Sequence, residues 1–134
     1  MSELFPLPPH FSAEARRLSA AGITTWAALA VLDDAPLRSL GRSGGASEAR
    51  LLRLRGQARL VVDLDLAPTD AALLLHAGIA SAAGLAQADP HRLLQQVIRL
   101  QRQLIGPGAV LLDLPTLRAW MRRATTRLAG RSPN

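Results

Sequence analysis

The sequence lacks cysteine, lysine and tyrosine, and each absence narrows what the protein can be. Without cysteine there is no disulfide, no thiolate metal ligand and no thiol nucleophile, which suits a reducing compartment. With two phenylalanines and two tryptophans, the chain has too few aromatic rings for a platform that stacks successive nucleic-acid bases. No apolar run approaches the roughly 18 residues of a membrane-spanning helix, so we expect no membrane partner.

Catalytic and metal-binding patterns are also absent from the sequence. His10, His76 and His91 have neither the spacing nor the cysteine or glutamate companions of a metal site. There is no Ser-His-Asp, HExxH or phosphate-loop pattern, and Gly41-x-x-Gly44 is not followed by lysine. We therefore expect no enzyme activity, no cofactor and no small-molecule substrate. His76 is expected on the surface, in the last turn of a helix whose dipole favours a positive charge.

Length and the first residues indicate the size class and the location. At 134 residues the chain is long enough for one domain with a core of its own. The segment from Met1 to Pro9 shows no basic stretch followed by an apolar one, so we expect no signal peptide. We therefore interpret the protein as cytoplasmic.

All 16 basic residues are arginine, and the net charge is +6. Either GC-rich codon usage or selection for guanidinium chemistry accounts for the arginine-only set. The charge alternates along the chain: residues 1–37 and 60–91 are net acidic, at −2 and −4, and residues 38–59 and 92–134 are net basic, at +5 and +7. Such asymmetry indicates a polyanionic partner, unless the arginines simply solvate the outer faces of long helices.

An internal repeat is the most informative pattern. Leu18-Ser-Ala-Ala-Gly22-Ile23 returns 56 residues later as Leu74-Leu-His-Ala-Gly78-Ile79. A repeat at a fixed offset predicts one supersecondary unit that is used twice. The closing helices match at an offset of 66 residues instead, so the second unit is longer, and its extra residues fall in a helix over 91–105.

The positions of proline and glycine divide the chain into four segments. We expect a proline-rich arm over 1–11, a first unit over 12–66, a second unit over 67–128 and a disordered tail over 129–134. Phe5 or Phe11 would hold the arm against the core.

Only helices are expected within the units. Gly22 and Gly78 end the first helix of each unit, as glycines that follow a C-cap do. Hydroxyl side chains that accept hydrogen bonds from helix N-termini are predicted at Ser12, at Thr24 or Thr25, at Ser47 and at Ser81. Apolar stripes at helical spacing are Leu51, Leu54, Ala58, Val61 and Val62; Leu93, Val97, Leu100 and Leu104, widened by Leu94, Ile98 and Ile105; and Leu117, Trp120, Met121, Ala124 and Leu128. Trp26 and Trp120 lie on apolar stripes, which favours core packing over base stacking. The strand-like stretches are Val61-Val62 and 109–112, and neither has a partner segment with an alternating pattern. We therefore expect the fold class to be all-α.

A helix, a Gly-hydrophobic pair and a second helix form the core of a helix-hairpin-helix motif. Residues 13–60 contain Leu18-x-x-x-Gly22-Ile23, Leu40-Gly41-Arg42 and a Ser-capped helix, and they resemble the C-terminal helical module of the bacterial RNA polymerase α subunit. Residues 13–128 as a whole more closely resemble an uncharacterised bacterial family, a domain of unknown function with paired helix-hairpin-helix-like units. The resemblance implies two tandem helix-hairpin-helix-like units in a SAM-like helical bundle.

In DNA-binding members of the helix-hairpin-helix class, the hairpin reads Gly-hydrophobic-Gly, and its backbone amides approach a phosphate. The resemblance carries this role to Gly22 and Gly78, although the second glycine is threonine in one copy and alanine in the other. Their alternative role is structural, as glycines that end helices. In the polymerase module the matching loop and the start of the next helix contact the DNA backbone, which carries over to Gly41 and Arg42.

Two functions remain open. The first is a non-enzymatic module that binds the phosphate backbone of nucleic acid with little sequence specificity. Its candidate residues are Gly22, Gly41, Arg42, Arg50, Arg53, Arg59, Gly78, Arg118, Arg122 and Arg123. Arg55, at the edge of its stripe, is expected to snorkel. The second function is a protein-interaction adaptor that uses the apolar helix 91–105. Arginines of helices 47–62 and 116–127 that gather on one face beside Gly22 or Gly78 would favour nucleic acid, and scattered arginines would favour the adaptor.

Overall fold

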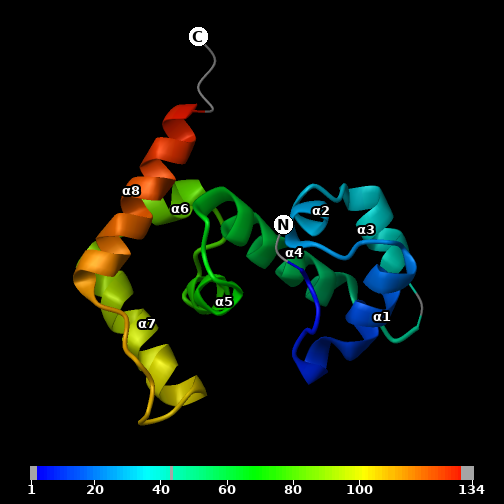
Figure 1. Ribbon diagram of the computed structural model, residues 1–134, viewed down its shortest axis with the longest axis horizontal. Helices are drawn as coiled ribbons and strands as arrows, with labels where there is room; N and C mark the ends of the chain where they lie inside the picture. The colour runs from blue at the N-terminus through cyan, green and yellow to red at the C-terminus, as the bar shows by residue number, and fades with distance from the viewer. Residues whose placement is uncertain (1–2, 43, 131–134) are drawn as a thin grey trace.

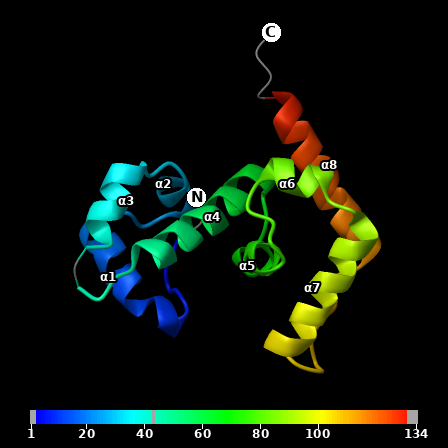
Figure 2. The same cartoon turned by 180° about the vertical axis from the view of Figure 1, so that it is seen from behind.

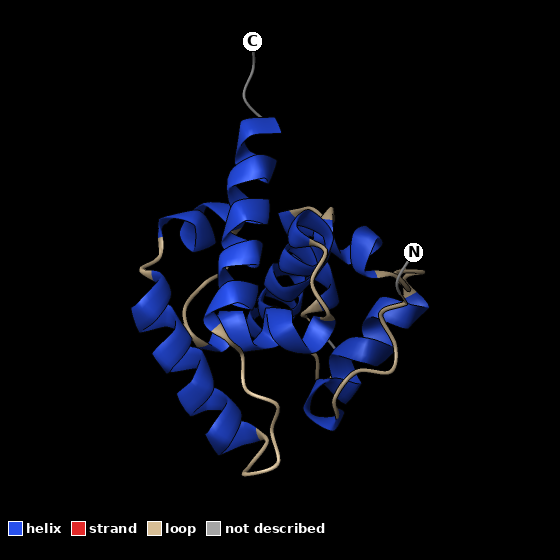
Figure 3. Cartoon of the chain, turned by 60° about the vertical axis from the view of Figure 1, so that its left-hand side comes forward, coloured by secondary structure: helices blue, strands red, loops and turns tan. Residues whose placement is uncertain are grey.

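The computed structural model describes residues 3–42 and 44–130, and in that range the regular structure is helical (Figure 3). No strand occurs among these residues, and Glu3 and Thr25 form a single antiparallel bridge. The all-α prediction is confirmed. The helices are a short 3-10 turn η1 (Pro9–Phe11), α1 (Ser12–Ala20), α2 (Trp26–Ala30), α3 (Asp34–Leu40), α4 (Glu48–Leu64), α5 (Pro68–His76), α6 (Ala82–Gln87), α7 (Pro90–Leu104) and α8 (Leu114–Gly130).

Helix α4 runs through the middle of the molecule and joins its two halves (Figures 1 and 2). Helices α1, α2 and α3 surround its first part, and α5, α6, α7 and α8 gather beyond its second part. Helix α2 packs against α4 in the first half, and α6 packs against α8 in the second. Helices α3 and α7 follow the same arrangement, since α3 contacts α4 and α7 contacts α8.

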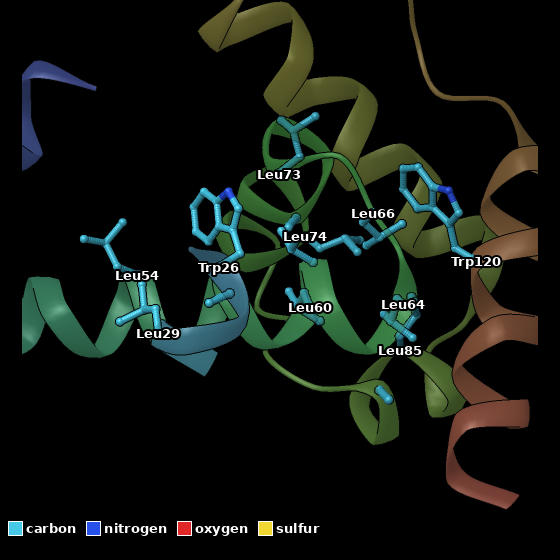
Figure 4. Close-up of a cluster of buried hydrophobic side chains, with 14 of the residues drawn as sticks. Trp26, Leu29, Leu54, Leu60, Leu64, Leu66, Leu73, Leu74, Leu85 and Trp120 are labelled. Carbon is cyan, nitrogen blue, oxygen red and sulfur yellow. The ribbon is translucent and has the colours of Figure 1, made fainter. Parts of the chain in front are cut away.

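A single apolar cluster follows α4 from one half to the other (Figure 4). Trp26 and Trp120 both belong to it, at 3% and 6% exposure, so the prediction that they are core residues is confirmed. The cluster also contains side chains from α2, α4, α5 and α6. They include Leu29, Leu54, Leu60, Leu64, Leu74 and Leu85.

The glycines that were predicted to end α1 and α5 have positive backbone angles. The φ angle is +77° at Gly22 and +89° at Gly78, in the left-handed region that glycine adopts without a steric penalty. In both hairpins the amide of the next residue donates to the carbonyl oxygen five residues back, which is the Schellman arrangement. The N···O distance is 2.9 Å between Ile23 and Leu18 and 2.8 Å between Ile79 and Leu74.

Helix N-termini follow the predictions except at Ser12. The side chains of Thr25, Ser47 and Ser81 each accept a hydrogen bond from an amide three residues on. The prediction for Ser12 is wrong, because α1 begins at that residue, directly after the 3-10 turn. Phe11 occupies the capping position and provides no side-chain acceptor.

Two apolar stripes are less buried than the helical periodicity predicts. Val62 is 45% exposed. Beyond Ala58, the face of α4 that carries Leu60 and Leu64 is the buried one, and Val62 lies on a different face. Leu104, the last residue of α7, is 58% exposed, and Ile105, which follows the helix, is 62% exposed. Helices α5 and α8 cover only a narrow face of α7.

The described residues nearest the two ends of the chain take part in the fold. Leu4 is fully buried, and its amide donates to the carbonyl oxygen of Thr24 at 3.0 Å, so the arm lies against the first hairpin. Phe11 is buried as well, whereas Phe5 is half-buried. Ala129 and Gly130, assigned to the tail, belong to α8, and residues 131–134 lie outside the described part of the chain.

Candidate functional site

The arginines of α4 point to two different sides of the helix. Arg50 and Arg53 face α5, where the Nη2 atom of Arg53 lies 3.2 Å from Nδ1 of His76. Arg59 faces α2 instead, and its Nε donates to the carbonyl oxygen of Ala30 at 3.2 Å. The structure therefore brings together Arg50 and Arg53 and separates Arg59 from them.

Arg50 and Arg53 line an open groove of about 380 Å³ between η1, α4 and α5. This groove, called the cationic groove below, is bounded by Pro8, His10, Phe11, Arg50, Arg53, Gln57, Ala72, Leu75 and His76. Four of these side chains carry nitrogen donors that are positively charged or can become so, and none of the lining residues is acidic. The lining also includes the apolar side chains of Phe11, Ala72 and Leu75.

His76 is exposed in the last turn of α5, as the sequence predicts, and the pKa of its imidazole is shifted. Its position at the end of α5 lowers the pKa of the imidazole from the usual 6.5, first through burial and then through the nearby charges of Arg53 and His10. Guanidinium and imidazole donors around an acid-free groove form an environment that attracts anions. The arrangement suits phosphate groups, which guanidinium binds through paired hydrogen bonds.

The side chain of Arg55 forms contacts within the protein. Its guanidinium Nη1 lies 2.7 Å from Oδ1 of Asp34 and donates to the carbonyl oxygen of Leu32 at 3.0 Å. The expectation that Arg55 snorkels at the edge of its stripe is wrong, because this pair lets the side chain stay buried at 8% exposure. The hydrogen bond and the charge of Arg55 lower the pKa of Asp34.

Arg123 on α8 is also engaged within the fold. Its Nη1 donates to the carbonyl oxygens of Leu64 and Asp65, both at 3.2 Å, and so satisfies the end of α4. One turn further along α8, Arg127 forms a 3.2 Å ion pair with Asp63. These contacts fasten α8 across the C-terminal end of α4.

The remaining sequence candidates lie outside the cationic groove. Arg42, Arg118 and Arg122 are exposed, and none of them lines the groove. Gly41 packs closely against the start of α4, where a Cβ would come within 2.8 Å of the Glu48 amide nitrogen. Around Gly22 and Gly78 there is open space at the place of a Cβ.

Sequence reasoning missed His10 and His76 as partners of the arginines. They come from η1 and α5, and the spacing of 23 residues between Arg53 and His76 gives no signal in the sequence. The only sequence feature that pointed toward the groove was the exposed, arginine-bearing face of the helix that follows Ser47.

The second half presents an apolar surface where α7 gives way to the loop before α8. Leu104, Ile105, Val110 and Leu111 are exposed, and Val110 reaches 93%. The buried Gln101 holds this loop: its Nε2 donates to the carbonyl oxygen of Val110 at 3.2 Å, and its Oε1 accepts from the amide of Leu112 at 2.9 Å.

Within residues 3–42 and 44–130, no cluster of three or more histidine, aspartate or glutamate side chains is placed to hold a metal ion. In the same ranges, no helix combines the length and apolarity needed to cross a membrane.

Fold and site together define an all-α protein with an arginine-lined groove on one side of its central helix. The chain belongs to the family described as Domain of unknown function (DUF4332), whose profile matches residues 8–127. This match confirms the expectation of an uncharacterised domain family. No curated protein and no solved structure matches the chain.

Proposed function

We propose that the protein is a non-enzymatic module that binds nucleic acid through the phosphate backbone, in the cationic groove. The observation that carries the proposal is the convergence of Arg50, Arg53, His10 and His76 around one groove whose lining residues include no acid. Contacts to phosphates carry no sequence information, so binding of this kind has little sequence specificity. Arg50 and Arg53 are its principal contacts. The arginines of α4 and α8 do not all gather on one face, which counts toward the adaptor, so the proposal rests on the groove and not on the total charge of these helices.

We also propose that α1–α4 and α5–α8 are two tandem helix-hairpin-helix-like units of a bacterial, cytoplasmic protein. The support is the agreement between the hairpins: positive φ at Gly22 and Gly78, and the same hydrogen bond across each turn. Thr25 and Ser81, which begin α2 and α6, add a third matching feature, since each accepts from an amide three residues on. The first hairpin also resembles the polymerase α-subunit module in sequence.

The proposal is tested by the affinity of the full chain for a labelled 20-base-pair duplex, measured by fluorescence anisotropy over a series of salt concentrations. A protein that neutralises phosphates loses affinity as salt rises, with a slope of about −0.9 on logarithmic axes for each contact. The Arg50→Glu/Arg53→Glu variant should lower the affinity at least tenfold and reduce the slope by about two.

A matched control separates a groove from diffuse attraction. Arg92→Glu/Arg99→Glu makes the same change in net charge on α7, where both side chains are exposed and outside the cationic groove. It should lower the affinity much less than the groove variant does. Equal losses in the two variants would reject the groove, and no binding by the wild type at about 50 mM salt, where phosphate contacts are strongest, would reject the function.

A protein-interaction adaptor is the second candidate function, favoured by the exposed apolar surface at Leu104, Ile105, Val110 and Leu111. Large exposed apolar side chains that adjoin one another mark interaction sites on soluble proteins. Self-association through this surface is tested by light scattering during size exclusion, where Val110→Asp should convert an oligomer to a monomer. A wild-type monomer at high concentration would remove that form of the adaptor.

A further inference from the structure

We infer that His76 is a positioning residue: it holds Arg53 in the cationic groove when neutral, and it releases Arg53 and binds the anion itself when protonated. Anion binding in the groove then becomes stronger as pH falls. The inference rests on the proposed function, because it concerns the same groove, and the ligand class is the phosphate group of nucleic acid.

The first step follows from which nitrogen can donate. An arginine guanidinium has only donors, so Nδ1 of His76, 3.2 Å from Nη2 of Arg53, must be the acceptor. The accepting nitrogen carries no proton, and the neutral ring therefore has its proton on Nε2. In this form His76 tethers Arg53 and fixes the guanidinium against α5.

The second step follows from the loss of that acceptor. Once His76 is protonated, both ring nitrogens are donors and both partners are cations, so the hydrogen bond to Arg53 can no longer exist. The guanidinium is then free to turn toward a phosphate in the groove, and the imidazolium offers its own N–H groups. Protonation thus changes one tethered cation into two that are available to the anion.

The surroundings of His76 determine which form prevails. The charged and titratable groups that face it are Arg50 and Arg53 from α4 and His10 from η1, and α7, on the other side of α5, contributes no residue to the groove. Burial and the charges of Arg53 and His10 lower the pKa of His76, so the neutral, tethering form predominates at neutral pH. A bound phosphate offsets the repulsion and raises the pKa, so binding takes up a proton.

A measurement that does not depend on duplex binding tests the Arg53–His76 contact. The pKa of each histidine in the full chain is measured by NMR from the ring Cε1–H signals, with and without inorganic pyrophosphate. The pKa of His76 should lie below 6.5 in the wild type, rise in Arg53→Gln and rise on adding pyrophosphate, while His91 on α7 should not move. A His76 pKa that responds to neither change would overturn the inference.

Duplex binding at pH 5.5 and pH 8.0, at constant ionic strength, tests the consequence. Wild-type affinity should be higher at pH 5.5, by up to about tenfold for each unit by which the phosphate raises the pKa of His76. In His76→Asn the amide oxygen still accepts from Arg53 but does not titrate, so the pH difference should shrink. His91→Asn is the matched control and should keep the wild-type difference, and His10→Asn measures the share of the other groove histidine.

The outcomes distinguish this inference from the proposed function. Duplex binding that is equal at both pH values and is lost in Arg50→Glu/Arg53→Glu would support the nucleic-acid function and overturn the role of His76. Absence of duplex binding, with a His76 pKa that rises on adding pyrophosphate and in Arg53→Gln, would support the groove as an anion site and reject nucleic acid. A His76 pKa unaffected by both, together with no duplex binding, would reject both ideas.

Discussion

Helices α1 and α2 in the first half and helices α5 and α6 in the second are joined by hairpins with the same hydrogen bonds, yet the helices that follow differ. Helix α3 has 7 residues, whereas its counterpart α7 has 15. The first half contributes Arg50 and Arg53 to the cationic groove, whereas the second half exposes apolar side chains around Val110. Few residues are needed to set a hairpin, so the surfaces beside it are free to diverge.

The loops that lead into the closing helices α4 and α8 extend the comparison. Each is fastened by one buried polar side chain, Glu14 in the first half and Gln101 in the second. The carboxylate of Glu14 accepts from the amide of Ser47 at 2.8 Å, whereas Gln101 both donates and accepts. The amide side chain of Gln101 matches a loop that offers both a carbonyl oxygen and an N–H. Only one oxygen of the Glu14 carboxylate is matched by an N–H, and the buried Oε1 has no hydrogen-bond partner among the described residues.

Leu18→Ala and Leu74→Ala have the largest expected effect. Both leucines are fully buried at matching places in the two hairpins, so truncation removes apolar contacts and leaves a cavity. Each variant should lose about 2–5 kcal/mol of unfolding free energy in urea denaturation. If the losses of the two variants differ by more than about 3 kcal/mol, which is the width of that range, the two hairpins do not support the core equally.

Arg55→Met transfers a residue of the second half into the first, since Met121 occupies the matching position in α8. The change leaves the carbonyl oxygen of Leu32 without its donor, and we expect a loss of about 1–3 kcal/mol of unfolding free energy. Unchanged or higher stability would show that an apolar side chain serves both halves equally well.

The same variant has a pH signature. Arg55 lowers the pKa of Asp34 in the folded state, so the ion pair adds stability above the ordinary value of 3.8, and this stability is lost as pH falls through the folded pKa. Acid sensitivity below that value should therefore be smaller in Arg55→Met than in the wild type, measured by urea denaturation at several pH values. Equal acid sensitivity would contradict the coupling.

Features that depend on neighbours in sequence could be predicted. The helix ends at Gly22 and Gly78 and the hydroxyl caps at Thr25, Ser47 and Ser81 are local, because each needs only a backbone conformation and an acceptor within a few residues. The helical stripes placed both tryptophans in the core for the same reason. The family match confirms the coarser part of the resemblance, that the chain belongs to an uncharacterised domain family.

Features that depend on how helices are turned against each other could not be predicted. The contact between Arg53 and His76 needs the rotation of α4 relative to α5, which periodicity alone does not give. The docking of Leu4 depends on a bridge between residues 3 and 25. Val62 was assigned to the buried side because a single stripe was assumed, whereas α4 is packed on more than one face.

Gly22→Ala and Gly78→Ala test whether the hairpin glycines act through conformation alone. Both have positive φ, and an added Cβ meets open space, so the cost is the left-handed backbone, about 1–2 kcal/mol in each half. Urea denaturation should give similar losses, with duplex affinity unchanged. A fall in affinity without a fall in stability would instead identify these glycines as phosphate contacts, which the resemblance to helix-hairpin-helix proteins implies.

Thr25→Ala and Ser81→Ala should have the smallest effect. The Thr25 hydroxyl accepts from the Ala28 amide at 3.1 Å, and the Ser81 hydroxyl accepts from the Gly84 amide at 3.0 Å. Each substitution removes one acceptor at a helix N-terminus and should lower the unfolding free energy by about 1 kcal/mol. Thr25→Ser and Ser81→Thr are the controls, because both keep the hydroxyl and should recover most of the loss. If Thr25→Ala and Ser81→Ala lose equal amounts of unfolding free energy, the two hairpins agree in the stability of their caps as well as in their geometry. A loss confined to Thr25 would show that the bridge to Glu3 makes this cap part of the arm's attachment, which the second half lacks among the residues described.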